Sequence, residues 1–149
     1  MGNADEIKMI AKNKKAFFDY HILDKWEAGI QLTGDEVKAV RNGKVNFKDS
    51  YAQAEKGEFF LVGLHISYTK SYGTPMPDRK RKLLLHKAEI RRISSKSQEK
   101  GLTIVPLAVY IKKNYIKVEI GTAKGKALYD KRRATKEKEL SRNIRREVW

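Results

Sequence analysis

Short segments in which apolar and polar residues alternate recur along the central part of the chain, a pattern typical of β-strands. Six segments predict strands that pair as three hairpins, in chain order Phe17–Leu23 with Trp26–Leu32, Asp49–Glu55 with Glu58–Ser67, and Leu102–Lys112 with Tyr115–Thr122. Predicted turns separate the members of each pair, at Asp24-Lys25, Lys56-Gly57 and Lys113-Asn114. Pro106 cannot donate a backbone hydrogen bond, so we expect an edge or a β-bulge there.

Two short helices are predicted between the strands. Thr33 and Glu36 have the spacing of a capping box, and Asn42-Gly43 can end that helix because both residues tolerate positive φ. Tyr68–Lys82 contains a glycine and two prolines and predicts a loop. A second helix is predicted over His86–Lys96, with its isoleucines toward the core.

Together these elements predict a mainly β protein, a small antiparallel barrel of the OB-fold type with two or three short flanking helices. We expect three parts: a flexible N-terminus over residues 1–12, the barrel over 13–122, and a flexible basic C-terminal tail over 123–149. In the tail, Leu140, Ile144 and Val148 recur every four residues among charges. So thin an apolar stripe predicts a segment that is disordered alone and helical on a partner.

Composition narrows the partner to a polyanion. The 149 residues include 33 Lys or Arg against 18 Asp or Glu, a net charge of +15. Such an excess attracts nucleic acid, with an anionic membrane as the alternative. The chain has no cysteine, which excludes disulfides and thiolate metal sites. No apolar run is long enough to span a bilayer and none resembles a signal peptide, so we expect a cytoplasmic protein with no membrane partner.

No constellation of residues predicts catalysis. The three histidines, His21, His65 and His86, are far apart in sequence and none has metal-ligand spacing. The segment Gly121–Lys126 lacks the spacing of a phosphate-binding P-loop. The adjacent carboxylates Asp35 and Glu36 point in different directions on a helix. We therefore expect no enzyme activity, no cofactor and no metal.

The junction of barrel and tail, Gly121–Arg132, is the strongest candidate for an RNA contact. Its basic residues alternate with glycines that let a backbone approach a phosphate, and Tyr129 offers a ring for stacking. From residue 122 onward there are ten Lys or Arg and four Asp or Glu. The alternative is a solubilising tail with an incidental tyrosine.

Three other features are ambiguous on local evidence. Asn13-Lys14-Lys15 precedes the first predicted strand. Glu27 lies within a strand, where its carboxylate is suited either to accept from base amino groups or to pair with a lysine, and the ion pair is favoured. The run Arg79–Lys82 is compatible with an RNA contact and with a solvated flank of the loop.

Taken in order along nearly the whole chain, several motifs resemble the SmpB (small protein B) family, the bacterial partners of transfer-messenger RNA (tmRNA). They are Asn13-Lys14-Lys15-Ala16, Asp19-Tyr20, Glu27-Ala28-Gly29-Ile30, Leu32-Thr33-Gly34-Asp35-Glu36-Val37-Lys38, Arg41-Asn42-Gly43-Lys44-Val45-Asn46, Asp49-Ser50-Tyr51, His65-Ile66-Ser67, Arg81-Lys82-Leu83-Leu84-Leu85-His86, Glu99-Lys100-Gly101, Gly125-Lys126 and Tyr129-Asp130-Lys131-Arg132. Each motif is weak alone, whereas the ordered set is specific.

The resemblance implies an adaptor rather than an enzyme. Its barrel would bind the tRNA-like domain of tmRNA around the D-loop and elbow, and its tail would contact small-subunit ribosomal RNA at the decoding centre and mRNA channel. Elongation factor Tu and alanyl-tRNA synthetase would be indirect partners through the RNA. The complex would rescue stalled ribosomes and tag incomplete peptides, the process called trans-translation.

The resemblance also implies roles for individual residues. RNA-binding roles fall on Asn13, Lys14, Lys15, Glu27, Leu84, Lys124 and Lys126. Contacts with the decoding centre fall on Tyr129, Asp130, Lys131 and Arg132. The tail ends at Val148-Trp149 and is short for the family, which puts its reach along the mRNA channel in question. A generic OB protein for single strands and a nuclease are the rival interpretations.

Overall fold

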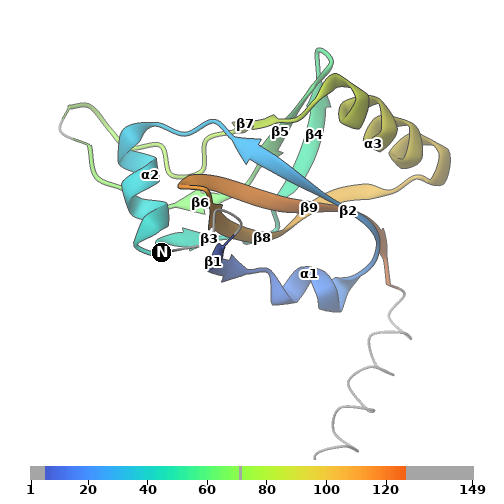
Figure 1. Cartoon of the computed structure of the whole chain (residues 1–149), viewed down its shortest axis with the longest axis horizontal. Coiled ribbons are helices and arrows are strands. Elements are labelled where there is room, and N and C mark those ends of the chain that lie inside the picture. The colour runs from blue at the N-terminus through green and yellow to red at the C-terminus, as the bar shows by residue number, and fades with distance from the viewer. Residues whose placement is uncertain (1–5, 71, 127–149) are drawn as a thin grey trace, which may run out of the picture.

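The computed structural model of the chain describes residues 6–70 and 72–126 (Figure 1). Its elements are β1 (Ile7–Lys12), α1 (Lys14–Asp19), β2 (Tyr20–Ile30), α2 (Gly34–Arg41), β3 (Val45–Asn46), β4 (Tyr51–Glu55), β5 (Glu58–Val62), β6 (His65–Ile66), β7 (Arg81–Leu84), α3 (Lys87–Lys100), β8 (Thr103–Lys112) and β9 (Tyr115–Gly125). No helix in the described part is long and apolar enough to cross a membrane.

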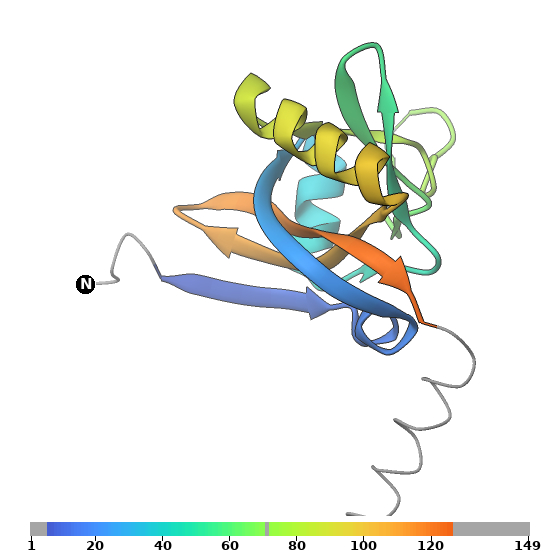
Figure 2. The same ribbon diagram turned by 90° about the vertical axis from the view of Figure 1, so that its right-hand side faces the viewer.

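The main sheet curls round on itself. Its strands follow the order β1-β8-β4-β5-β7-β2-β9, and β9 also pairs with β8, which brings the two sides of the sheet together. Every strand pairing in it is antiparallel. The short strands β3 and β6 form a separate pair. The predicted mainly β, antiparallel architecture is therefore confirmed, with three helices around the sheet (Figures 1 and 2).

The core lies inside the curled sheet, where alternate side chains of each strand point inward. Its fully buried side chains include Phe59, Leu61, Leu83, Ile93 and Ile120. Ile93 belongs to α3, so this helix covers the core as the isoleucine spacing predicted. Because successive side chains of a strand point to opposite faces, packing of the core also decides which residues point outward. These outward residues form the candidate site.

Local signals placed several elements correctly. Thr33 Oγ1 accepts from the Glu36 amide and Glu36 returns a carboxylate oxygen to the Thr33 amide, so the capping box of α2 is confirmed. The predicted turns at Lys56-Gly57 and Lys113-Asn114 are present, with positive φ at all four residues. The register shifts between Pro106 and Ala108, as expected for a proline that cannot donate to the ladder.

The predicted hairpin of Phe17–Leu23 with Trp26–Leu32 is wrong. Residues Lys14–Asp19 form helix α1, and β2 then runs through Asp24-Lys25 without a turn. A bulge between Ile22 and Asp24 absorbs the local irregularity. The Asp24 amide is satisfied by Thr122 Oγ1 at 3.2 Å. A partner almost a hundred residues away therefore keeps the strand continuous.

The expected limits of the barrel also change. Residues 7–12, expected to be a flexible N-terminus, form β1 on the edge of β8. Strand β9 continues past Thr122 to Gly125, and Ala123 is buried against Val105 and Leu107. Residues Arg81–Leu84 were expected to lie in a loop and in the segment that leads into the next helix, but they form strand β7. Helix α3 extends to Lys100 rather than Lys96. The rest of the predicted tail lies outside the described residues.

Candidate nucleic-acid interface

Glu27 and Leu84 lie on the same outer face of the sheet, as their predicted shared role requires. Gly29 pairs with Leu84 across β2 and β7, and Glu27 is two residues from Gly29, so both point outward. A Cβ at Gly29 would lie only 3.1 Å from the Leu84 Cβ. The glycine therefore lets Leu84 lie close across β2, although 52% of Leu84 is exposed.

Residues that sequence reasoning missed complete this face. The Tyr110 hydroxyl donates to the Glu27 carboxylate at 2.5 Å, and Lys112 Nζ lies 3.5 Å from it. Lys117 pairs with Gly29 from β9, and its Nζ lies 5.9 Å from the centre of the exposed Tyr115 ring. Alternation within the two predicted strands marked these side chains as outward-facing, but only the register between strands brings them to Glu27.

The hydrogen-bond pattern of Glu27 keeps it ionised. The bond from Tyr110, together with the nearby lysines Lys112 and Lys117, holds the pKa of the Glu27 carboxyl below its usual value. Burial and the bond to Glu27 raise the pKa of Tyr110, which stays a donor. The ion pair that the sequence favoured for Glu27 is therefore present, with Lys112 as its partner. One acceptor lobe of an exposed carboxylate still faces solvent on a face rich in lysine.

Two hollows lie along β2 near Glu27 and Gly29. A hollow of about 220 Å³ lies over Gly29, Leu84, Tyr115 and Lys117. A larger one of about 480 Å³ is lined by apolar side chains from β1, α1, β2 and β8 together with the charged side chains of Lys12, Lys25, Glu27 and Glu119. Apolar and aromatic walls with lysines at their rims suit bases, sugars and phosphates in combination.

Four other predicted RNA-binding residues gather at a different place, where α1 meets the end of β9. The Lys126 amide donates to the Asp19 carbonyl at 2.9 Å, which ties β9 to α1. Lys14 and Lys124 are exposed there, and Lys15 pairs with Asp49 at 2.6 Å. The structure thus separates the predicted residues into a barrel face and a basic end where α1 meets the end of β9. Figure 2 shows α1 beside the end of β9.

Asn13 differs from the direct RNA contact that was expected. It is buried and caps α1, with its side-chain oxygen accepting from the Ala16 amide at 3.2 Å. Its Nδ2 donates to the Pro106 carbonyl at 2.8 Å. Both ends of the amide are therefore engaged inside the protein. The asparagine positions α1 and its lysines instead of facing a ligand.

Replacing Asn13 with alanine is expected to lower the free energy of unfolding by about 2 kcal/mol. The change removes an N-cap and leaves the Pro106 carbonyl without its donor. Urea unfolding followed by circular dichroism measures the loss, and Lys14→Ala, an exposed neighbour on the helix, serves as control with an expected change under about 0.5 kcal/mol. If Asn13→Ala were as stable as the parent but bound RNA poorly, the amide would be a direct contact.

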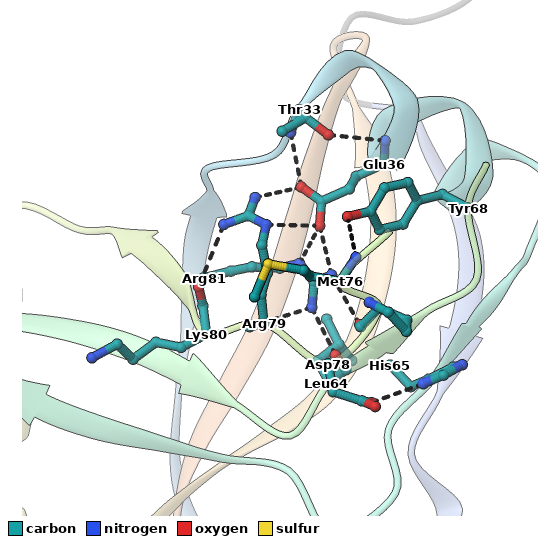
Figure 3. Close-up of polar contacts among 11 residues, drawn as sticks. Thr33, Glu36, Leu64, His65, Tyr68, Met76, Asp78, Arg79, Lys80 and Arg81 are labelled. Atoms are coloured by element: carbon teal, nitrogen blue, oxygen red, sulfur yellow. Dashed lines mark hydrogen bonds and ion pairs between the residues drawn. The ribbon is translucent and has the colours of Figure 1, made fainter. Parts of the chain in front are cut away.

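The run Arg79–Lys82 is engaged within the protein. Arg79 and Arg81 both pair with Glu36, whose side chain is fully buried (Figure 3). Lys80 pairs with Glu55 and Lys82 lies 3.9 Å from Glu58. Each of the four cations has a carboxylate partner, so the structural interpretation of this run is favoured over an RNA contact.

No metal site emerges in the described part of the chain, which holds no group of three potential ligand side chains. His65 contacts Asp78 at 2.8 Å and Ser67 at 3.1 Å, whereas the other two histidines lie elsewhere. Tyr129, Asp130, Lys131 and Arg132, the predicted decoding-centre contacts, lie outside the described residues. Their roles remain predictions.

Comparisons with known proteins cover almost the whole chain. The family model described as SmpB protein matches residues 10–149. The SsrA-binding protein of Syntrophobacter fumaroxidans is 54% identical over 145 residues, 96% of this chain and 90% of its own length. That of Carboxydothermus hydrogenoformans is 52% identical over 139 residues, 92% of this chain and 93% of its own.

A solved structure is also similar. It is described as "tmRNA-SmpB: a journey to the center of the bacterial ribosome". Its matching chain is 49% identical, with a TM-score of 0.66 over 79% of this chain and 85% of that one. At 49% identity the two chains are similar in sequence as well as in fold.

Proposed function

The chain belongs to the SmpB family, and on that premise we propose that it is an RNA-binding adaptor for trans-translation. It binds the tRNA-like domain of tmRNA and delivers it to ribosomes stalled on incomplete messages. The observation that carries the proposal is the relationship to SsrA-binding proteins over 96% of the chain. The net charge of +15 and the lysine-rimmed barrel face agree with an RNA partner.

The proposal divides the partners between two regions. The barrel face holds the tRNA-like domain, and the basic tail meets ribosomal RNA at the decoding centre and mRNA channel. Elongation factor Tu and alanyl-tRNA synthetase act on the RNA and so are linked to the chain only indirectly. The place of action is the cytoplasm, where the ribosomes are.

The geometry of the barrel face supports a mixed mode of RNA binding. Glu27 offers an ionised acceptor to base amino groups, and Lys112 and Lys117 offer cations to phosphates. Leu84 and Tyr115 offer exposed apolar surface to a base or sugar. This combination favours one folded RNA over any single strand, because acceptor, cations and apolar surface must be matched together.

The proposal gives the chain no reaction to catalyse. The adaptor presents RNA to a ribosome whose own peptidyl-transferase centre performs the transfer. Incubating the purified protein with labelled tmRNA, with and without Mg²⁺, tests the nuclease alternative. Intact RNA over many multiples of the rescue time agrees with an adaptor, and metal-dependent cleavage by the pure protein would contradict it.

Replacing Glu27 with alanine is expected to weaken binding of the tRNA-like domain by about tenfold or more, although it makes the protein more positive. Loss of a charge-assisted hydrogen bond is worth about 1–3 kcal/mol, whereas electrostatic attraction alone would improve. Glu99→Ala is the matched control, since Glu99 is exposed on α3, lines neither hollow of the barrel face, and its loss changes the charge equally. The control is expected to bind as well as the parent or better.

A second control separates contact with RNA from support of the fold. Tyr110→Phe removes the internal hydrogen bond and leaves the Glu27 carboxylate in place. If Tyr110→Phe binds RNA normally while Glu27→Ala does not, the carboxylate contacts RNA. Equal losses in both variants would assign Glu27 to the internal bond, and unchanged binding in Glu27→Ala would remove it from the interface.

A further inference from the structure

Glu119 is a partly buried carboxylate on the barrel face that has no partner inside the described part of the protein. It lies directly opposite Glu27, because the two residues pair across β2 and β9. Within residues 6–70 and 72–126, its side chain forms no hydrogen bond and no ion pair. Like charges directly opposite each other destabilise a sheet. An acidic residue at this position is therefore unfavourable for the fold.

The lysines around Glu119 do not neutralise it. Lys112 Nζ lies 3.5 Å from the carboxylate of the other glutamate of the pair. Lys12 and Lys25 line the same hollow as Glu119, but neither forms an ion pair in the described residues. Their Nζ atoms lie 5.5 and 5.6 Å from the centre of the Phe17 ring. A residue that opposes both the fold and the attraction of RNA is expected in a natural protein where it contacts a ligand directly.

The hollow that Glu119 lines has room for a flat ring. Its volume is about 480 Å³, and the rings of Phe17 and Tyr110 belong to its lining. Ala108 lies opposite Glu119 across β8 and β9, and its small side chain leaves space beside the carboxylate. Met9 lies opposite Tyr110 and adds apolar surface. Small-molecule sites have volumes of roughly 300–1,000 Å³ and the same mixture of apolar walls with a few polar groups.

The hydrogen bonds within the protein leave Glu119 as the open acceptor of the pair. Burial, the bond to Glu27 and the charges of Glu27 and Glu119 raise the pKa of Tyr110, so its hydroxyl stays protonated and donates to Glu27. No donor among the described residues reaches Glu119. An ionised carboxylate only accepts hydrogen bonds, through two oxygens. The ligand that fits it best therefore brings two neighbouring N–H donors.

We infer that Glu119 determines specificity for one unpaired guanine of the bound RNA. Guanine presents an N1–H and an N2–H₂ group side by side on its Watson–Crick edge, whereas the same edges of adenine, cytosine and uracil each present one donor group. This edge is free where the nucleotide is unpaired, as in RNA loops. The base stacks on the apolar walls, and Lys12 and Lys25 meet the flanking phosphates. The inference rests on the proposed function in taking the tRNA-like domain as the RNA on this face.

The first test uses a substitution for which charge and contact predict opposite results. Glu119→Gln keeps the size of the side chain and removes one negative charge, so electrostatic attraction alone would tighten binding of the tRNA-like domain. Loss of a bidentate base contact is expected to weaken that binding by about tenfold or more. Glu99→Gln makes the same change on an exposed part of α3, outside both hollows, and is expected to bind as well as the parent or slightly better.

Thermal unfolding of the free proteins separates an RNA contact from support of the fold. Because Glu119→Gln removes one of two opposed charges, its unfolding midpoint is expected at or above that of the parent. Weaker RNA binding without loss of stability is a result that a structural role cannot give. If the variant lost both stability and RNA affinity, Glu119 would be a support of the sheet and the inference would be wrong.

A second test locates the guanine. The tRNA-like domain is transcribed with a low fraction of inosine phosphorothioate, which replaces guanine at random and lacks its N2 amino group. Bound and free molecules are then separated and cleaved with iodine. With the parent and with Glu99→Ala, inosine is expected to interfere with binding at one unpaired position. With Glu119→Ala, interference at that position is expected to disappear, because the amino group no longer has its acceptor, while interference elsewhere stays unchanged.

Other results would contradict the inference in distinct ways. Tighter binding by Glu119→Gln would show that the residue acts only as a negative charge. An interference pattern shared by the parent and Glu119→Ala would show that it contacts no guanine amino group. Weakening that occurs only in the presence of Mg²⁺ would assign the two glutamates to a bound cation. Each of these results leaves the proposed function standing, whereas a parent protein that failed to bind the tRNA-like domain would contradict both.

Discussion

Replacing Glu36 with glutamine is expected to lower the free energy of unfolding by about 3–5 kcal/mol, because it leaves buried guanidinium charge without its counter-charge. The Glu36 and Arg81 side chains are both fully buried. Arg81 Nε donates to Glu36 at 2.6 Å, and Arg79 donates to the same carboxylate. A neutral amide cannot accept from both arginines and from the Thr33 amide in the same way.

Urea unfolding of the parent and of Glu36→Gln measures this difference. Glu55→Gln is the matched control, since it makes the same chemical change in the partly exposed pair with Lys80. An exposed pair contributes at most about 1 kcal/mol, so the control should change little. If the two variants lost the same amount, the buried cluster would contribute no more than a surface pair.

The same cluster makes the free energy of unfolding depend on pH. Burial opposes ionisation of Glu36, but hydrogen bonds from Arg79, the Thr33 amide and Arg81 outweigh it and hold its pKa below the usual carboxyl value. The folded state therefore binds this proton less readily than the unfolded state. The stabilisation is complete above the usual carboxyl pKa and is lost as pH falls through the lowered folded pKa. Glu36→Gln should lose less stability than the parent over that acidic range.

Changing Asp130, Lys131 and Arg132 together to alanine is expected to abolish peptide transfer to tmRNA while altering affinity for the tRNA-like domain by less than a few-fold. The triple change removes one negative and two positive charges from a protein of net charge +15, so long-range attraction hardly changes. The described barrel face lies on β2, β7, β8 and β9, before these residues in the chain. Tyr129→Ala, made separately, should behave likewise if its ring stacks in the decoding centre, at about 1–3 kcal/mol there.

Two measurements on each variant decide this prediction: the dissociation constant for the tRNA-like domain, and transfer on a ribosome stalled at the end of a truncated message. Lys136→Ala, Glu137→Ala and Lys138→Ala together are the control, since they make the same charge change further along the tail. A smaller defect in the control would locate the effect at residues 130–132. Equal loss of binding and transfer in the first triple would make the tail an ordinary extension of the RNA-binding surface.

The parts of the fold that were predictable are those decided by neighbours in sequence. The capping box of α2 and the turns at Lys56-Gly57 and Lys113-Asn114 depend on residues within a few positions of one another. The turn predicted at Asp24-Lys25 and the flexibility predicted for residues 7–12 were wrong because both segments pair with distant strands. Asp24-Lys25 resembles a turn, but pairing with β9 and the bond from Thr122 keep it within a strand.

The candidate site shows the same limit. The family resemblance selected Glu27 and Leu84, which the register of β2 and β7 does bring to one face. Their companions Tyr110 and Lys117 required the register of β8 and β9, which alternation cannot supply. The run Arg79–Lys82 looked like exposed positive charge, because nothing local indicates that Glu36, more than forty residues earlier, is buried against it.

The pairing of the first strands of the sheet with its last strands bears on how the protein is made. β1 and β2 receive their hydrogen bonds largely from β8 and β9, with Tyr20 opposite Gly125. Such distant contacts form late, so the nascent chain cannot close its sheet until nearly all of it has left the ribosome. A fragment released before Thr103 would expose the unpaired edge of β2 and the inner faces of its other strands, which invites proteolysis and aggregation. Synthesis of this protein is therefore itself sensitive to interruption before β9, because only a chain that includes β9 can close the sheet.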